Sequence, residues 1–147
     1  MKARSVVLIV WLIAVIAGCG IFGAKKPQID IVGTWNGKSH DGSPASMVFQ
    51  KDGTVYITIT VEGYNLSMGG KYTVDYTTEP VALDMRDIDL SEFGMVLYCP
   101  SIVAFPDPGR MTLYGMFAEY DGTARPTAFN TRPTQMGEIY LELTKEQ

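Results

Sequence analysis

The sequence predicts an all-β protein, an antiparallel barrel of eight to nine strands that follows an N-terminal signal peptide. Three observations lead to this fold class. Apolar and polar residues alternate with a period of two in most segments after Ile31, as in strands with one face on a core. Turn signals such as Asp52-Gly53 separate these segments, and no stretch has a convincing amphipathic helical pattern. Closing such a meander into a barrel removes its exposed edges.

The N-terminus has the composition of a secretory signal peptide. Lys2 and Arg4 precede the apolar run Val6–Ile16, and the small residues Ala17 and Gly18 follow it. A charged start, a short apolar core and small residues before the cut are typical of such a signal. We therefore expect the domain that follows to lie outside the cytoplasm.

The segment Ile16-Ala17-Gly18-Cys19 resembles the lipobox of bacterial lipoproteins, which reads aliphatic, small, small, Cys. The resemblance implies that Cys19 is the lipid attachment site, with a diacylglycerol on its sulfur and fatty acyl chains such as palmitate. Cleavage before Cys19 would remove residues 1–18 and leave residues 19–30 as a lipidated tether. With Gly20 next, the chain resembles lipoproteins sorted to the outer membrane, facing the periplasm, in a cell with two membranes. An uncleaved membrane helix over Ser5–Ala24 is the alternative, although its glycines weaken a helix.

Residues 31–147 are enough for one domain with its own core. Cleavage would remove two of the 12 basic residues and none of the 16 acidic ones, so the mature chain is acidic. Nucleic acid is therefore not an expected partner, because phosphate binding needs clustered Lys and Arg. With Cys19 lipidated, Cys99 has no disulfide partner, and we expect a buried thiol.

The expected strands follow one another closely from Ile31 to Thr144. They are Ile31–Lys38, Met47–Gln50, Thr54–Glu62, Lys71–Tyr76, Val81–Arg86, Met95–Cys99, Ile102–Phe105, Arg110–Phe117 and Gly137–Thr144. Asp52-Gly53 predicts a hairpin between the second and third. Pro100 separates the sixth from the seventh, because proline cannot donate to a ladder. Asp87–Phe93 is at most one helical turn. Eight strands enclose a space that is either filled by side chains or holds one small ligand.

Gly33-Thr34-Trp35 opens the first of these strands. Together with Gly70–Asp75, Pro80–Asp84 and Arg125–Phe129, it resembles a bacterial lipocalin-like domain of uncharacterised function, over about Ile31 to Thr144. The resemblance implies a lipocalin-like (calycin-type) barrel in which Trp35 lies across the closed end. It also implies a late arginine stacked on that ring, for which Arg125 is the candidate. Arg132, which also precedes a proline, is a second candidate.

The segment Ser67–Tyr72 bears a fainter resemblance to a loop of membrane-bound lysozyme inhibitors, S-x-x-G-x-K/R-Y. That resemblance implies a loop projecting from the barrel, with Lys71 as its basic residue. The spacing here is one residue shorter than in the inhibitors.

Catalytic and metal-binding patterns are scarce, so we expect neither an enzyme nor a metal or cofactor. His40 is the one histidine, and its neighbours are turn residues, so we expect it in a solvated turn. Asp84, Asp87 and Asp89 form the densest carboxylate group, but Arg86 lies among them and their spacing is not that of a calcium loop. A solvated acidic edge is the simpler interpretation.

A pocket for an apolar or amphipathic molecule is the stronger candidate site. The segment Arg110–Phe117 is apolar on both faces, methionine lines adaptable pockets, and tyrosine hydroxyls can orient a ligand. The candidate pocket residues are Tyr72, Met111, Tyr114 and Phe117. The alternative is that these side chains pack a filled barrel.

The sequence therefore predicts a monomeric, lipid-anchored protein of the cell envelope that binds a small apolar or amphipathic ligand without catalysis. The alternative is an envelope structural or protein-interaction lipoprotein with a filled barrel, for example an inhibitor of a cell-wall hydrolase.

Overall fold

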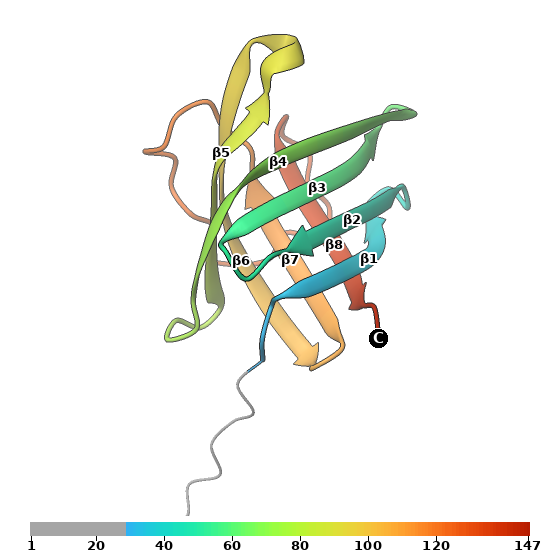
Figure 1. The fold of residues 1–147 in the computed structure, drawn as a ribbon, viewed down its shortest axis with the longest axis vertical. Coiled ribbons are helices and arrows are strands. Elements are labelled where there is room, and N and C mark those ends of the chain that lie inside the picture. Colours follow the sequence, from blue (N-terminus) through green and yellow to red (C-terminus); the bar gives the residue numbers. More distant parts are fainter. Residues whose placement is uncertain (1–28) are drawn as a thin grey trace, which may run out of the picture.

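The computed structural model describes residues 29–147, which form one closed antiparallel barrel of eight strands (Figure 1). The elements are β1 (Gly33–Ser39), β2 (Pro44–Phe49), β3 (Thr54–Val61), β4 (Tyr64–Asp75), β5 (Val81–Leu90), η1 (Ser91–Phe93), β6 (Met95–Asp107), β7 (Arg110–Met116) and β8 (Glu138–Lys145). Each strand pairs with the next, and β8 pairs with β1. The predicted all-β barrel is confirmed. The signal peptide and Cys19 lie outside the described residues, so the predictions on them stay predictions.

The barrel has two distinct ends. The described chain enters β1 at the end that we call proximal, which also carries the β2–β3, β4–β5 and β6–β7 turns and the C-terminus (Figure 1). The opposite, distal end carries the β1–β2 and β3–β4 turns, the projecting β5–β6 hairpin with η1, and the β7–β8 connection. In the part of the chain that the structure describes, no helix has the length and apolar character needed to cross a membrane.

The strand count is eight because β6 runs straight through Pro100. The register with β5 pairs Asp84 with Pro100 and continues on both sides. On the β7 side, regular pairing stops at Ser101↔Gly115 and resumes only as the isolated bridge Tyr98↔Ala118. The ladder is thus interrupted where proline lacks an N–H. The prediction of two strands separated at Pro100 was wrong.

The strand β4 is longer than predicted, since it begins directly after the two-residue turn Glu62-Gly63. Both turn residues have positive φ, 51° and 83°, as a two-residue hairpin with the twist of its strands requires. Gly70 lies within this strand at a close approach, because a Cβ there would lie 2.8 Å from the Arg86 carbonyl oxygen. Ser67–Tyr72 is therefore strand, and the expectation of a projecting loop was wrong.

Side chains from every strand fill the barrel interior. The most completely buried inward side chains include Trp35, Met47, Phe49, Val55, Ile57, Met68, Leu83, Met85, Ile88, Cys99, Val103, Met111, Leu113, Leu141 and Leu143. In the middle of the barrel, a Cβ on Gly115 would lie 2.2 Å from Ser101 Oγ, so even a methyl group does not fit there. The packing is therefore that of a protein core.

A second, smaller cluster lies on the outer surface of the barrel. Ile102, Tyr114 and Tyr140 are buried there, with Phe129 packed against them. Phe129 belongs to the β7–β8 connection, so this long segment is held against the barrel wall. Apolar burial of this kind stabilises a connection that has no strand or helix of its own.

Candidate functional site

Trp35 lies buried at the proximal end of the barrel, near the start of β1. Its indole Nε1 donates to the Ile31 carbonyl oxygen at 2.7 Å, and the Phe105 ring lies 6.1 Å away at a tilt of 51°. The cation over its ring is Lys145, with Nζ 5.3 Å from the centroid. Lys145 Nζ also donates to the Asp30 carbonyl oxygen at 2.9 Å. One ring thus joins the chain entry, β6 and the last residue of β8.

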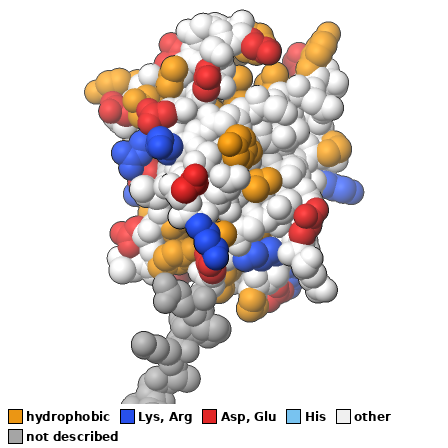
Figure 2. Space-filling model, viewed as in Figure 1, with side chains coloured by type: hydrophobic (Ala, Val, Ile, Leu, Met, Phe, Trp, Pro, Cys, Tyr) orange, Lys and Arg blue, Asp and Glu red, His pale blue; other side chains and the backbone are white. Residues whose placement is uncertain are grey.

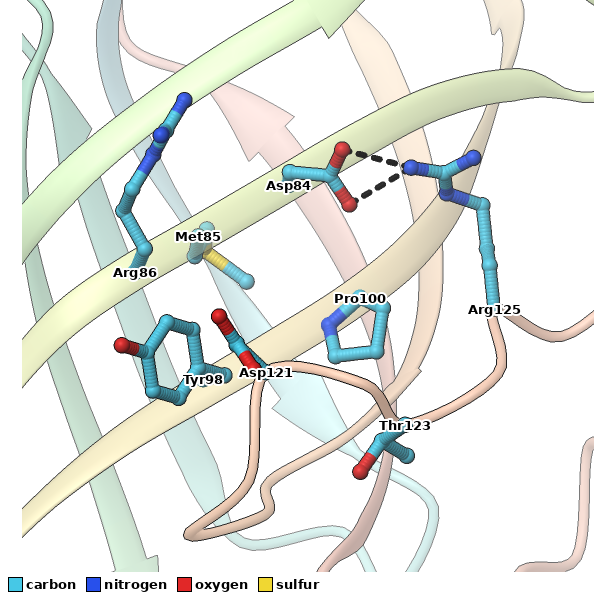
Figure 3. A pocket seen from close by; sticks show the side chains of 8 residues that line it. All are labelled: Asp84, Met85, Arg86, Tyr98, Pro100, Asp121, Thr123 and Arg125. Carbon is cyan, nitrogen blue, oxygen red and sulfur yellow. Dashed lines mark hydrogen bonds and ion pairs between the residues drawn. The ribbon is translucent and has the colours of Figure 1, made fainter.

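Arg125 lies elsewhere, and the expectation that it stacks on Trp35 was wrong. Its Nη2 lies 2.6 and 2.5 Å from the two carboxylate oxygens of Asp84, on the outer face of β5 (Figure 3). The reason is topological: the β7–β8 connection, which contains Arg125, runs outside the barrel, whereas Trp35 points inward. The second candidate, Arg132, is an exposed residue of the same connection.

The Asp84–Arg125 ion pair closes one side of a surface cleft of about 460 Å³. Its lining residues come from β5, β6 and the β7–β8 connection: Asp84, Met85, Arg86, Tyr98, Pro100, Asp121, Thr123 and Arg125. Figure 3 shows Arg86 extending away from the ion pair. The cleft offers both signs of charge and no histidine, which suits polar contacts more than proton transfer.

A second hollow, of about 620 Å³, lies at the distal end between the β3–β4 hairpin and η1; we call it the distal groove. Its lining residues are Thr54, Tyr56, Asn65, Leu66, Ser67, Gly69, Gly70, Asp89, Leu90, Ser91, Glu92 and Phe93. The set combines exposed aromatic side chains with two carboxylates. Both hollows are open to the outside of the barrel.

The four candidate pocket residues do not line one cavity. Tyr72 packs edge-on against Phe49, with ring centroids 5.0 Å apart, and its hydroxyl donates to the Gln50 carbonyl oxygen at 2.8 Å. Met111 is buried in the interior, and Phe117 packs against the same core. Tyr114 faces the other way, into the outer cluster, and donates to Glu138 Oε1 at 2.5 Å. Each of these side chains is accounted for by packing.

Most inward side chains of the described barrel are packed against one another. A cavity that held a ligand would leave surface on its lining side chains that a water molecule could reach. The inward side chains of β1, β2, β3, β5, β7 and β8 leave almost none. These strands of the described barrel are therefore packed as a core.

The described part of the chain contains one cysteine, Cys99, and one histidine, His40, and they lie in different surroundings. Cys99 is fully buried, and burial raises the pKa of its thiol to about 12, so it is protonated at neutral pH. Its predicted burial is confirmed. His40 is exposed in the β1–β2 turn, as expected. No group of three or more potential metal ligands occurs within residues 29–147, where Asp84 is bound by Arg125 and Asp87 and Asp89 are exposed.

The distal groove was missed by sequence reasoning, although two signals for it exist. Glu62-Gly63 is a turn signal that places Tyr64–Met68 in a strand, and the alternation of Tyr64, Leu66 and Met68 with polar residues has the period of a strand. The glycines at 69 and 70 concealed this pattern, because glycine is more common in turns.

Comparison of the chain with protein-family models, with curated proteins and with solved structures gives no match.

Proposed function

We propose that this protein is a lipid-anchored, non-enzymatic binding protein of the cell envelope that contacts a protein partner through the outer surface of its barrel. The observation that carries the proposal is the contrast between the filled interior and the two hollows on the outside. A small-ligand carrier needs an enclosed apolar pocket. Of the two functions that the sequence left open, the geometry favours the protein-interaction lipoprotein.

The membrane anchor is supported by the lipobox-like residues ending at Cys19. Each buried methylene of an acyl chain contributes about 0.8 kcal/mol, so two or three chains hold a protein firmly at a bilayer. The described chain enters at the proximal end, so a short tether keeps that end toward the membrane and leaves the distal end free (Figure 1).

The anchor is tested by radiolabelled palmitate and intact mass. In the native host, the full-length protein should incorporate label, and its mass should correspond to a chain that starts at Cys19 and carries acyl groups. Cys19→Ser should lose the label, whereas Cys99→Ala, the matched control at the other cysteine, should keep it. An unlabelled protein that retains residues 1–18 would show that the anchor is an uncleaved helix.

The filled interior is tested by native mass spectrometry of the protein purified from its own host in mild detergent. We expect the mass of the lipidated chain without a further bound molecule. A lipid retained apart from the covalent acyl chains would overturn the outer-surface proposal and restore the ligand carrier.

A further inference from the structure

The barrel wall splits at its distal end, between the β3–β4 and β5–β6 hairpins. The strand β4 pairs with β3 from Tyr64↔Val61 onward, but its pairing with β5 begins only at Gly69↔Asp89. Figure 1 shows the two hairpins diverging above that point. The segment Tyr64–Met68 therefore has a strand neighbour on one side only, and we call its other side the open edge.

The backbone of the open edge faces the split. Val61 and Tyr64 close a two-residue hairpin, so they form a hydrogen-bonded pair. Hydrogen-bonded pairs alternate along an antiparallel ladder, and the residues between them direct their N–H and C=O groups to the opposite side. Asn65 and Ser67 are these intervening residues, and both are exposed. They present donors and acceptors to any strand that enters the split.

The open edge has none of the features that normally prevent strand addition. Edge strands are usually protected by lysine, proline or inward-pointing charges. Tyr64–Met68 contains no charged residue and no proline, and Asn65 and Ser67 engage only Thr60 and Thr58 of β3 through their side chains. An exposed and unprotected edge is the surface to which an extended peptide adds as a further strand.

The distal groove lies directly along this edge. Leu66 and Leu90 are half-buried against the core, so they form its apolar base. Tyr56 and Phe93, 50% and 59% exposed, flank it, and Asp89 supplies a carboxylate, as does the neighbouring Glu92. None of the residues that line the groove is lysine or arginine. Figure 2 likewise shows acidic and hydrophobic side chains, but no basic ones, at the upper end of this face.

We propose that the distal groove binds an extended, basic segment of a protein partner, which adds as a strand to the open edge of β4. The proposal rests on the proposed function and names the class of partner. Main-chain hydrogen bonds at the edge provide affinity, and lysine or arginine side chains pair with the carboxylates and stack on the two aromatic rings. A second copy of this chain is a poor occupant, because the chain carries a net charge of −4 and like charges repel across an interface.

The test uses the full-length protein in neutral detergent micelles and two synthetic peptides, (Lys-Val)₄ amide and (Glu-Val)₄ amide. Amide NMR shifts on adding the basic peptide should concentrate at Asn65–Ser67 and Asp89–Phe93, and the acidic peptide should give none. Equal binding of both peptides, or shifts confined to other residues, would overturn the proposal. Shifts of the same residues that depend on protein concentration without peptide would assign the edge to a second copy instead.

Two variants separate the charge from the strand edge. The double variant Asp89→Asn/Glu92→Gln should weaken binding of the basic peptide by about fivefold. The matched control Asp52→Asn/Glu79→Gln, which removes two carboxylates from the proximal turns, should leave it unchanged. Ser67→Pro removes a backbone donor from the open edge and should abolish binding; if that variant does not fold, the charge variants alone decide.

Different results would reject the groove proposal and the proposed function. If the peptide does not bind the groove but a partner cross-links to the cleft beside Arg125, the proposed function stands and the groove proposal fails. If a lipid is found inside the barrel, the proposed function fails whatever the peptide does.

Discussion

At the scale of single residues, Trp35 links three distant parts of the chain around one buried ring. Its indole N–H is bound to Ile31, its face is covered by Lys145, and Phe105 packs beside it. Lys145 also crowds Gly33, where a Cβ would lie 2.8 Å from Lys145 Cε and where φ is 133°, a value that side-chain-bearing residues rarely adopt. The first glycine of the Gly33-Thr34-Trp35 motif is thus required by its backbone conformation, since the flexible end of Lys145 could move aside.

Replacing the two candidate cations shows which of them stabilises the barrel. Lys145→Met should lower the free energy of unfolding by about 1 kcal/mol, because it removes a cation–π contact and a hydrogen bond to the Asp30 carbonyl. Arg125→Met should change it by less than about 0.5 kcal/mol, since its ion pair is solvent-exposed. Urea unfolding of both variants measures the difference. A larger loss for Arg125→Met would mean that the arginine carries the structural role after all.

The inward position of Trp35 was expected from the resemblance carried by Gly33-Thr34-Trp35, but its partner was not. Lys145 is a lysine near the C-terminus with no motif around it, and only the closure of β8 onto β1 brings it to the ring. The face of β7 on which Tyr114 lies was equally unpredictable from the sequence. Because β7 is apolar on both faces, the period-two pattern cannot tell which face points into the barrel. In the structure Met111 points inward and Tyr114 points outward.

At the scale of elements, Glu138 organises the β7–β8 connection. Its Oε2 accepts from the backbone amides of Thr134 and Gln135 at 2.9 and 2.8 Å, and its Oε1 accepts from the Tyr114 hydroxyl. These hydrogen bonds, that of Tyr114 foremost, hold the pKa of the Glu138 carboxyl below its usual value of 4.5. One carboxylate at the start of β8 therefore holds the end of the connection against the barrel.

Removing this charge should loosen the connection without unfolding the barrel. In Glu138→Gln, amide exchange at Thr134 and Gln135 should become about tenfold faster. In the unaltered protein the same loosening should appear as pH falls below 4.5 through the lowered pKa, because protonation is more favourable in the open form. Glu142→Gln is the control, since Glu142 accepts from the Tyr140 hydroxyl but holds no amide of the connection. Equal exchange rates in the two variants would contradict this role.

Strand positions were largely predictable from period-two alternation, whereas strand lengths were not. The hairpin at Asp52-Gly53 and the strands β3, β5, β7 and β8 lie where the alternation places them. The two errors, at Pro100 and over Tyr64–Gly70, share one cause. Proline and glycine ordinarily end strands, but one continuous neighbour is enough to carry each strand through: β5 pairs with β6 across Pro100, and β3 pairs with β4 across Tyr64–Gly70.

At the scale of the whole molecule, buried neutral groups set the response to alkali. Burial raises the pKa of Cys99 to about 12 and that of Tyr72 and Tyr76 above their usual 10. The unfolded chain therefore binds fewer protons than the folded chain at high pH, so the free energy of unfolding falls as pH rises from about 9.

Cys99→Ala isolates the largest of these effects. Between pH 9 and 12 the thiol accounts for up to about 4 kcal/mol of the loss. The variant should therefore lose less stability over this range than the unaltered protein, as measured by urea unfolding at each pH. Parallel pH profiles would show that Cys99 ionises without opening the barrel.

Whether the barrel is filled could not be decided from the sequence. Eight strands permit either a packed core or a pocket, and the choice depends on how the residues of opposite walls meet. Ser101 and Gly115 show how local this packing is: they are partners on the neighbouring strands β6 and β7, and the space beside Gly115 is already taken by the Ser101 side chain. The distal groove likewise depends on the residue at which β4–β5 pairing stops. That residue is set by how the two strands are aligned in the folded barrel.

The pairing of β1 on both sides also determines how the barrel resists a pull on the entering chain. The described chain enters directly into this strand, which is bonded to β2 along one side and to β8 along the other. A pull on the entering chain acts along the strand axis, at right angles to the hydrogen bonds of both ladders. The hydrogen bonds of the two ladders then share the force and must break together instead of one after another. In the proposed function, this arrangement would let the barrel bear tension between the proposed membrane anchor and a bound partner.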